Sequence, residues 1–149
     1  MNGCEVAVLV PCFNEEITIA KVTQDFRAAL PGAKIYVYDN NSTDETFRAA
    51  LEAGAIVRRE AWQGKGNVVR RMFADIDADI YVLVDGDDTY DAGAAPKLID
   101  LLLRDQLDFV NGARESEEIA AYRRGHRFGN YVLTQLVRQI FGPRFRDML

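Results

Sequence analysis

Residues 79–91 read DIYVLVDGDDTYD, and the fold class can be predicted by working outward from this segment. The apolar run 79–84 is rich in β-branched and aromatic residues, a composition typical of a strand that is buried on both faces. Four aspartates follow within seven residues, starting where the strand ends. A buried strand that leads directly into an acidic loop is typical of a parallel sheet whose ligand binds at its carboxyl edge.

Apolar runs alternate with helical stretches on both sides of this strand. Further strands are expected at residues 5–10, 34–38, 55–57 and 108–110. Helices are expected at about residues 14–30, 42–53, 66–76, 94–104 and 126–141. Because parallel strands need helical crossovers, this order predicts an α/β fold, a Rossmann-like three-layer αβα arrangement around a mostly parallel sheet. A single domain spanning residues 1–149 is expected.

The composition indicates a globular protein that folds without disulfides. Of its 149 residues, 48% are hydrophobic, which is enough to bury a core. Cys4 and Cys12 are too few for a disulfide framework and are expected to be buried, reduced thiols of a cytoplasmic protein. The net charge of −5 argues against nucleic acid as a partner. No apolar run is long enough for a membrane helix.

The acidic loop at residues 85–91 is expected to hold a divalent cation. Its like charges repel one another unless a cation is bound, and hard cations such as Mg²⁺ and Mn²⁺ accept both carboxylate and phosphate oxygens. An acidic surface turn is the plainer alternative, since Asp and Gly are common turn residues. A calcium loop of the EF-hand type is excluded, because its sixth and twelfth positions would be Tyr90 and Pro96 instead of glycine and glutamate.

Asp85, Asp87 and Thr89 also match the Asp-x-Asp-x-Thr signature of the aspartate-nucleophile phosphatases. In that hypothesis Asp85 attacks phosphorus and Asp87 acts as acid and base. The likeness implies a lysine farther downstream, whereas the last lysine of this chain is Lys97. The hypothesis also gives the other strand ends no role.

Four polar segments occur in an order that resembles the family-2 glycosyltransferases. They are VPCFNEE at residues 10–16, YDNNSTDET at 38–46, GKGN at 64–67 and DGDDTYD at 85–91. The likeness is greatest to the polyprenyl-phosphate and dolichyl-phosphate sugar synthases. This resemblance implies a glycosyltransferase A-type fold and a hexosyltransferase that takes a UDP- or GDP-linked sugar as donor, with Mg²⁺ or Mn²⁺ as cofactor.

The resemblance also implies roles for individual residues. Pro11, Phe13 and Glu15 would line the nucleoside pocket, and Asp39 would meet the base or the ribose. Lys65 would reach phosphate or base, Asp85 and Asp87 would hold the metal, and Arg114 would hold phosphate, so that Asp87 and Arg114 are the implied catalytic residues. An aromatic ring can stack on a base and carboxylates accept hydrogen bonds from ribose, which agrees with these roles.

Some positions fit the family's pattern less well. Asn40 stands where a second aspartate is frequent, and Thr89 stands where dolichyl-phosphate synthases often have glutamine. Asn14 is open to two interpretations, as a helix cap or as a ligand. His126 is expected to be a surface or packing residue.

An inverting transfer is the implied mechanism, in which metal and basic groups stabilise the departing diphosphate. A lipid-phosphate acceptor is already anionic and needs no general base, whereas a hydroxyl acceptor does. Asp147 resembles the aspartate before the family's Ser-Gly-Phe/Tyr-Arg segment, which this sequence does not contain. The catalytic domain is therefore expected to be cut short on its C-terminal side. A module that binds the donor without turnover is the alternative.

Residues 111–149 are rich in arginine, and the helix expected at 126–141 has a wide apolar face. In one interpretation this helix packs on the sheet and the arginines are solvated. In the other, the apolar face contacts a membrane surface or later chain segments, and the arginines hold the acceptor's phosphate or anionic lipid.

Overall fold

The computed structural model describes residues 3–112. The chain divides into two compact units, residues 1–110 and 111–149, and the elements named here lie in the first. They are, in chain order, β1 (Val6–Cys12), α1 (Ile19–Ala29), β2 (Lys34–Asp39), α2 (Thr46–Glu52), β3 (Ile56–Arg59), α3 (Lys65–Asp75), β4 (Ile80–Leu83), the short 3-10 helix η1 (Ala92–Ala94) and α4 (Ala95–Arg104).

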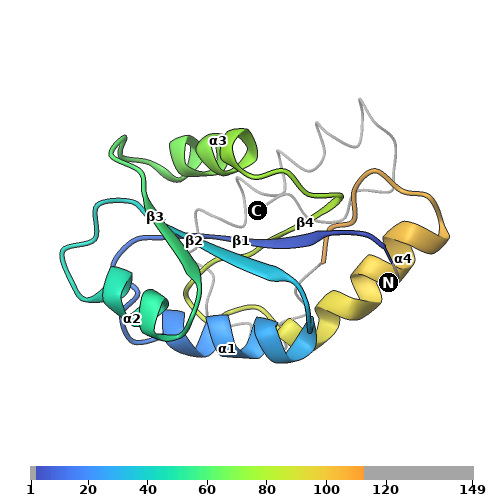
Figure 1. Cartoon of the computed structure of the whole chain (residues 1–149), viewed down its shortest axis with the longest axis horizontal. Coiled ribbons are helices and arrows are strands. Elements are labelled where there is room, and N and C mark those ends of the chain that lie inside the picture. The colour runs from blue at the N-terminus through green and yellow to red at the C-terminus, as the bar shows by residue number, and fades with distance from the viewer. Residues whose placement is uncertain (1–2, 113–149) are drawn as a thin grey trace, which may run out of the picture. The chain divides into compact units, whose positions relative to one another are not determined.

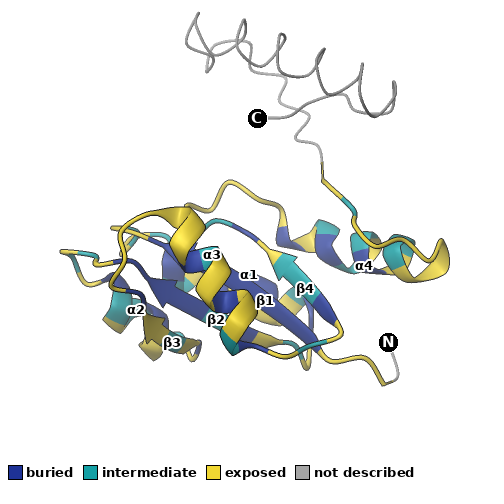
Figure 2. Cartoon of the chain, turned by 90° about the horizontal axis from the view of Figure 1, so that it is seen from above, coloured by how far each residue is buried: buried dark blue, intermediate teal, exposed yellow. Residues whose placement is uncertain are grey.

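The four strands form one parallel sheet in the order β3-β2-β1-β4 (Figure 2). On one side of β1, Ala7–Cys12 pair with Lys34–Asp39 of β2, and on the other side Val6–Leu9 pair with Ile80–Leu83 of β4. The chain thus runs outward from β1 to β3 and returns to the other side of β1 as β4. This order brings the ends of β1 and β4 side by side, although they are far apart in the sequence.

Helices cover both faces of the sheet, with α1, α2 and α4 on one face and α3 on the other (Figure 1). Side chains of β1 alternate between the two cores, because successive residues of a strand point to opposite faces. Val8 and Val10 belong to the larger core, together with Phe26 of α1, whereas Leu9 packs in the smaller core with Met72 of α3. The predicted three-layer αβα fold is confirmed.

Residues 108–110 do not form the strand that their composition predicts. After α4 the chain turns through Gln106, whose φ is 51°, and Phe109 is 78% exposed. A strand needs a neighbour for its backbone hydrogen bonds, and a short apolar run alone does not provide one. The prediction of a strand at this point is wrong. The helix predicted at 126–141 lies outside the described residues.

The two cysteines differ in their surroundings. Cys12 ends β1 and is buried, and this burial raises the pKa of its thiol. Cys4 precedes β1 and is exposed, so the prediction of two buried thiols is wrong for Cys4. Among the helices within residues 3–112, none is both long enough and apolar enough to cross a membrane.

Candidate functional site

The carboxyl edge of the sheet gathers the polar segments that the sequence singles out, because all four parallel strands end there. From β1 the chain passes through α1 to β2 on one side, and it later returns to β4 on the other side of β1, so the strand order reverses at β1. Open α/β sheets bind ligands at such a reversal of strand order. The predicted site residues on this edge are Pro11, Phe13, Glu15, Asp39, Lys65, Asp85 and Asp87. Arg114 lies outside the described residues.

Asn14 joins the loop after β1 to the loop after β2. Its backbone N–H donates to Ser42 Oγ at 2.9 Å, and its side-chain Oδ1 accepts from the backbone N–H of Thr43 at 2.8 Å. Asn14 also adopts a left-handed φ of 54°, a conformation that asparagine tolerates better than most residues. Since α1 begins only at Ile19, the interpretation of Asn14 as a helix cap is wrong.

The next two residues extend this junction. The backbone N–H of Glu15 donates to Thr46 Oγ1 at 2.7 Å, and that of Glu16 donates to Asp44 Oδ2 at 3.2 Å. The backbone of the Pro-Cys-Phe-Asn-Glu-Glu segment is therefore fixed by side chains of the β2–α2 loop. The Glu15 side chain takes no part in these bonds and extends toward the acidic loop.

The Glu15 carboxylate lies against Gly86, in the middle of the acidic loop. A methyl group at position 86 would overlap Glu15 Oε2 and would lie 3.2 Å from Ile19 Cδ1. Thr18 Oγ1 donates to the carbonyl of Gly86 at 2.7 Å, which adds a second link between the same two segments. A larger residue at position 86 would therefore force the Glu15 carboxyl group to move. The sequence analysis missed this contact, because the Asp-Gly-Asp pattern is equally typical of a turn.

Glu15 carries an unusual carboxyl group. Its Oε2 atom is buried and has no hydrogen-bond partner among the described residues. Burial, and after it the nearby charges of Asp87 and Asp85, raise the pKa of this carboxyl group to about 7. A buried polar atom without a partner costs free energy, so such atoms often mark functional sites.

The residues predicted to meet the nucleoside differ in exposure. Phe13 is 47% exposed, Asp39 is 2% exposed and Pro11 is buried within β1. Asp39 Oδ1 accepts from the backbone N–H of Ser42 at 3.0 Å, and its Oδ2 lies 3.8 Å from Arg59 Nε. Phe13 thus offers ring surface to a ligand, whereas Asp39 is oriented by its own loop.

The first two aspartates of the acidic loop have partners from different places. Lys65, at the start of α3, forms an ion pair with Asp85 and so connects the end of β4 with the β3–α3 segment. Asp87 Oδ1 accepts hydrogen bonds from its own loop, from Thr89 N at 3.2 Å and Thr89 Oγ1 at 2.6 Å. Both carboxylates remain partly or fully exposed at the carboxyl edge.

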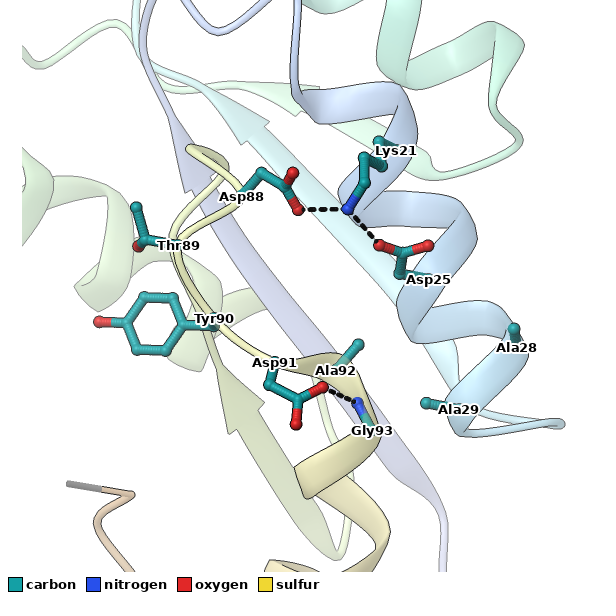
Figure 3. A pocket seen from close by; sticks show the side chains of 10 residues that line it. All are labelled: Lys21, Asp25, Ala28, Ala29, Asp88, Thr89, Tyr90, Asp91, Ala92 and Gly93. Carbon is teal, nitrogen blue, oxygen red and sulfur yellow. Dashed lines mark hydrogen bonds and ion pairs between the residues drawn. The ribbon is translucent and has the colours of Figure 1, made fainter. Parts of the chain in front are cut away.

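The other two aspartates support the loop. Lys21 of α1 lies between Asp25 and Asp88, at 2.8 Å from an oxygen of each (Figure 3). Asp88 has a left-handed φ of 61°, which this ion pair helps to hold. Asp91 Oδ1 accepts from Gly93 N at 2.9 Å and begins η1. No sequence pattern predicts the Lys21–Asp88 pair, because its members are distant in the chain.

A pocket of about 640 Å³ lies beside these support residues, between α1 and the segment Asp88–Gly93 (Figure 3). Lys21, Asp25, Ala28 and Ala29 line it from α1. Neither Asp85 nor Asp87 lines it, and the Tyr90 ring points away from α1. The pocket therefore lies on the α1 side of the acidic loop and includes neither of the two aspartates predicted to hold the metal.

The donor set at the carboxyl edge suits a hard divalent cation that shares its coordination with phosphate. Within residues 3–112 no three His, Cys, Asp or Glu side chains converge to enclose a metal by themselves. Mg²⁺ is usually held by only one or two carboxylates together with substrate phosphates. Asp85 and Asp87 fit that requirement. Glu15 Oε2, which has no hydrogen-bond partner among the described residues, lies beside Gly86, the residue between them in the sequence.

Comparison with protein families gives a match over nearly the whole chain. The protein-family model described as "Glycosyl transferase family 2" matches residues 7–147 of this chain. The chain belongs to glycosyl transferase family 2. The match includes all four polar segments named from the sequence.

Several known proteins are similar in sequence to this chain. Protein RfbJ of Shigella flexneri is 57% identical over 127 residues, which cover 85% of this chain and 98% of RfbJ. Glycosyltransferase AglJ of Haloferax volcanii is 38% identical over 146 residues, covering 97% of this chain and 48% of AglJ. The dolichyl-phosphate hexose transferase of the same organism is 31% identical over 143 residues, covering 96% of this chain and 62% of that protein. The chain thus spans about half the length of AglJ and under two thirds of the hexose transferase.

A solved structure supports the same fold. Glucosyl-3-phosphoglycerate synthase from Mycobacterium tuberculosis, in complex with Mn²⁺, UDP-glucose and phosphoglyceric acid, superposes with a TM-score of 0.62 at 30% identity. The match covers 68% of this chain and 40% of that one. The glycosyltransferase A-type likeness expected from the sequence is thereby confirmed.

Proposed function

We propose that this chain is the donor-binding part of a metal-dependent, inverting glycosyltransferase that moves a sugar from a nucleotide diphosphate to an acceptor. Residues 1–149 would form one nucleotide-sugar-binding catalytic domain. The observation that carries the proposal is the convergence of Glu15, Lys65, Asp85 and Asp87 at the carboxyl edge, at the reversal of strand order.

The nucleoside would bind along the ends of β1 and β2. Phe13 offers an exposed ring on which a base can stack, and Asp39 has a carboxylate that its loop already orients. Pro11, buried at the end of β1, would form the floor of this pocket. Glu15 would line the pocket next to Phe13, as the family resemblance implies, with its Oε2 against Gly86.

The diphosphate would bind between α3 and the acidic loop. Lys65 would neutralise phosphate oxygens, and Arg114 would contribute a second cation. A Mg²⁺ or Mn²⁺ ion held by Asp85 and Asp87 would stabilise the negative charge that develops on the diphosphate leaving group. The structure of the synthase with Mn²⁺ and UDP-glucose, a relative in fold and sequence, supports this donor class.

A lipid phosphate such as a polyprenyl phosphate is the proposed acceptor. Its oxygen is already anionic, so the transfer requires no general base from the chain. The similarity to a dolichyl-phosphate hexose transferase supports this choice. An acceptor of this kind lies at a membrane surface, and we propose that a cytoplasmic enzyme meets it there through its arginine-rich C-terminal part.

Titration calorimetry with UDP-glucose and a GDP-linked hexose, each with Mn²⁺ and with excess chelator, tests the proposal. We expect one of the two donors to bind only when Mn²⁺ is present. Equal affinity in chelator would reject the metal-dependent site. Transfer of labelled sugar to a short polyprenyl phosphate would then separate an active enzyme from a module that binds donor without turnover.

The phosphatase hypothesis is tested with the same protein. Membership of glycosyl transferase family 2 favours sugar transfer over an Asp85 nucleophile. We expect no hydrolysis of aryl phosphates. Turnover that disappears in Asp85→Asn would instead support the phosphatase.

A further inference from the structure

Asn40 follows Asp39 at the end of β2, yet its side chain belongs to a different part of the edge. The residue is 4% exposed, and its backbone N–H donates to Cys12 O at 2.9 Å. Its side-chain Nδ2 donates to the carbonyls of Glu60 and Trp62, both at 2.9 Å. Its Oδ1 accepts from the backbone N–H of Gly64 at 2.7 Å. The amide is therefore fully engaged with the segment between β3 and α3.

This pattern of bonds requires an amide. Two carbonyl oxygens need two donor hydrogens, and the Gly64 N–H needs an acceptor, which only the asparagine side chain supplies at this length. An aspartate here would place a buried carboxylate against two carbonyl oxygens. The departure from the family's more frequent aspartate thus has a physical reason in this chain.

The segment that Asn40 holds ends directly at Lys65. Gly64 precedes α3 with a left-handed φ of 121°, and no side chain caps that helix end. Lys65 is the first residue of α3, and its ammonium reaches Asp85 across the edge. The position of the Lys65 backbone therefore depends on how Gly64 is held, and Asn40 is the buried side chain that holds it.

We infer that Asn40 is a positioning residue that sets Lys65 against the donor diphosphate and does not itself bind the nucleoside. The inference rests on the proposed function, because it assigns the diphosphate to Lys65. It differs from the role that the position next to Asp39 suggests. A nucleoside contact would tolerate aspartate, whereas the loop contact does not.

Asn40→Asp is the decisive variant, because it keeps the shape and the acceptor and removes both donors. Affinity for UDP with Mn²⁺ should fall about tenfold, since two buried carbonyls lose their partners and Lys65 shifts. Affinity for uridine, which has no phosphate, should stay within about twofold of the original by the same reasoning. In a Lys65→Met background the effect of Asn40→Asp on UDP affinity should disappear, because Asn40 acts on the diphosphate only through Lys65.

The neighbouring asparagine provides a matched control. Asn41 is exposed and donates to Ala61 O at 2.9 Å and to the Gln63 side chain, so it contacts the same segment from outside. It has a left-handed φ of 65°, which aspartate also tolerates. Asn41→Asp should change UDP affinity by less than about twofold, because solvent can replace the lost donor.

Trp62 is the only tryptophan of the chain, so its fluorescence reports on the held segment without any ligand. Time-resolved anisotropy should show a larger fast component in Asn40→Asp than in the original chain or in Asn41→Asp. Asn40→Ala, which adds no buried charge, should show the same change and serves if the aspartate variant does not fold.

Three outcomes would overturn the inference. They are equal losses of uridine and UDP affinity in Asn40→Asp, an undiminished loss in the Lys65→Met background, and unchanged Trp62 anisotropy. If the original chain binds neither UDP nor GDP, the proposed function fails and the role of Lys65 fails with it. The anisotropy would in that case still decide whether Asn40 holds the loop.

Discussion

The two edges of the same parallel sheet use charged residues in different ways. At the amino edge, Lys34 pairs with Glu5, and the Glu5 backbone N–H donates to Asp79 Oδ2 at 2.7 Å. All three residues are exposed. At the carboxyl edge, Asp39 and Asn40 are buried, and the half-buried Glu15 keeps one oxygen without a partner.

The exposed charges of the amino edge have little effect on stability, whereas the buried carboxyl oxygen of Glu15 at the carboxyl edge lowers it. Exposed ion pairs contribute little to stability, and losing one is easily compensated by water. A buried carboxyl oxygen without a partner destabilises the fold, and proteins keep such groups mainly at functional sites. The predictions that follow test this contrast between the edges.

Asp87→Ala should have the largest effect. Because the metal would bridge this carboxylate and the diphosphate, affinity for UDP with Mn²⁺ should fall on the order of 100-fold, the upper range for altered metal-site residues. Titration calorimetry measures the change. Asp79→Ala at the amino edge is the matched control and should leave the affinity unaltered; equal losses in both variants would remove the distinction between the edges.

Gly86→Ala should destabilise the chain by about 1–3 kcal/mol, the usual range for overpacking. The new methyl group would overlap Glu15 Oε2. Urea unfolding measures the change. Combining the substitution with Glu15→Ala should recover much of the loss, because the overlapping atoms are gone; simple additivity of the two changes would contradict the contact.

Glu15 should make stability depend on pH. Its folded pKa of about 7 lies above its ordinary value of 4.5, so the protonated form is favoured by folding, and its stabilisation is lost as pH rises through 7. Between pH 5 and 8, in chelator, the loss should be roughly 1–2 kcal/mol after allowance for the group's partial exposure.

Glu15→Gln, which stays neutral at every pH, is the control for this titration. Urea unfolding of both proteins at several pH values should show that the difference between them grows in favour of the glutamine variant from about pH 5 to pH 7 and levels off above that. Parallel pH profiles would mean that Glu15 does not titrate in this window.

Lys34→Ala should have the smallest effect. Its ion pair with Glu5 is exposed, so the midpoint of thermal unfolding should move by about 2 °C or less. Nucleotide affinity should not change. A large loss of either would show that the amino edge has a role beyond local pairing.

The fold could be predicted where the hydrophobic pattern of a segment matches its burial in the folded chain. The runs that became β1, β2 and β4 are apolar on both faces, and only a buried parallel strand requires that. Residues 108–110 show the limit, because three suitable residues do not determine whether a neighbouring strand is available. Loops after the strands were located correctly for the same reason that the strands were.

The site was predictable as a set of segments but not as a set of contacts. Parallel topology alone brings the segments containing Glu15, Asp39 and Asp85 to one edge. It does not say that Glu15 fills the space beside Gly86, or that Asn40 holds the β3–α3 segment. Those contacts depend on side-chain directions across distant loops, for which a single sequence has no periodicity to read.

The contact between Glu15 and Gly86 limits how this protein can be re-engineered. The acidic loop cannot be grafted onto another parallel sheet by itself, because the space beside its central glycine, Gly86, is filled by Glu15 from the β1–α1 turn. A transplant would have to carry the β1–α1 turn with it, including Thr18, whose hydroxyl bonds to the Gly86 carbonyl. Substitutions at position 86 alone would displace the Glu15 side chain, whereas libraries that vary the two positions together would reach combinations that single substitutions cannot.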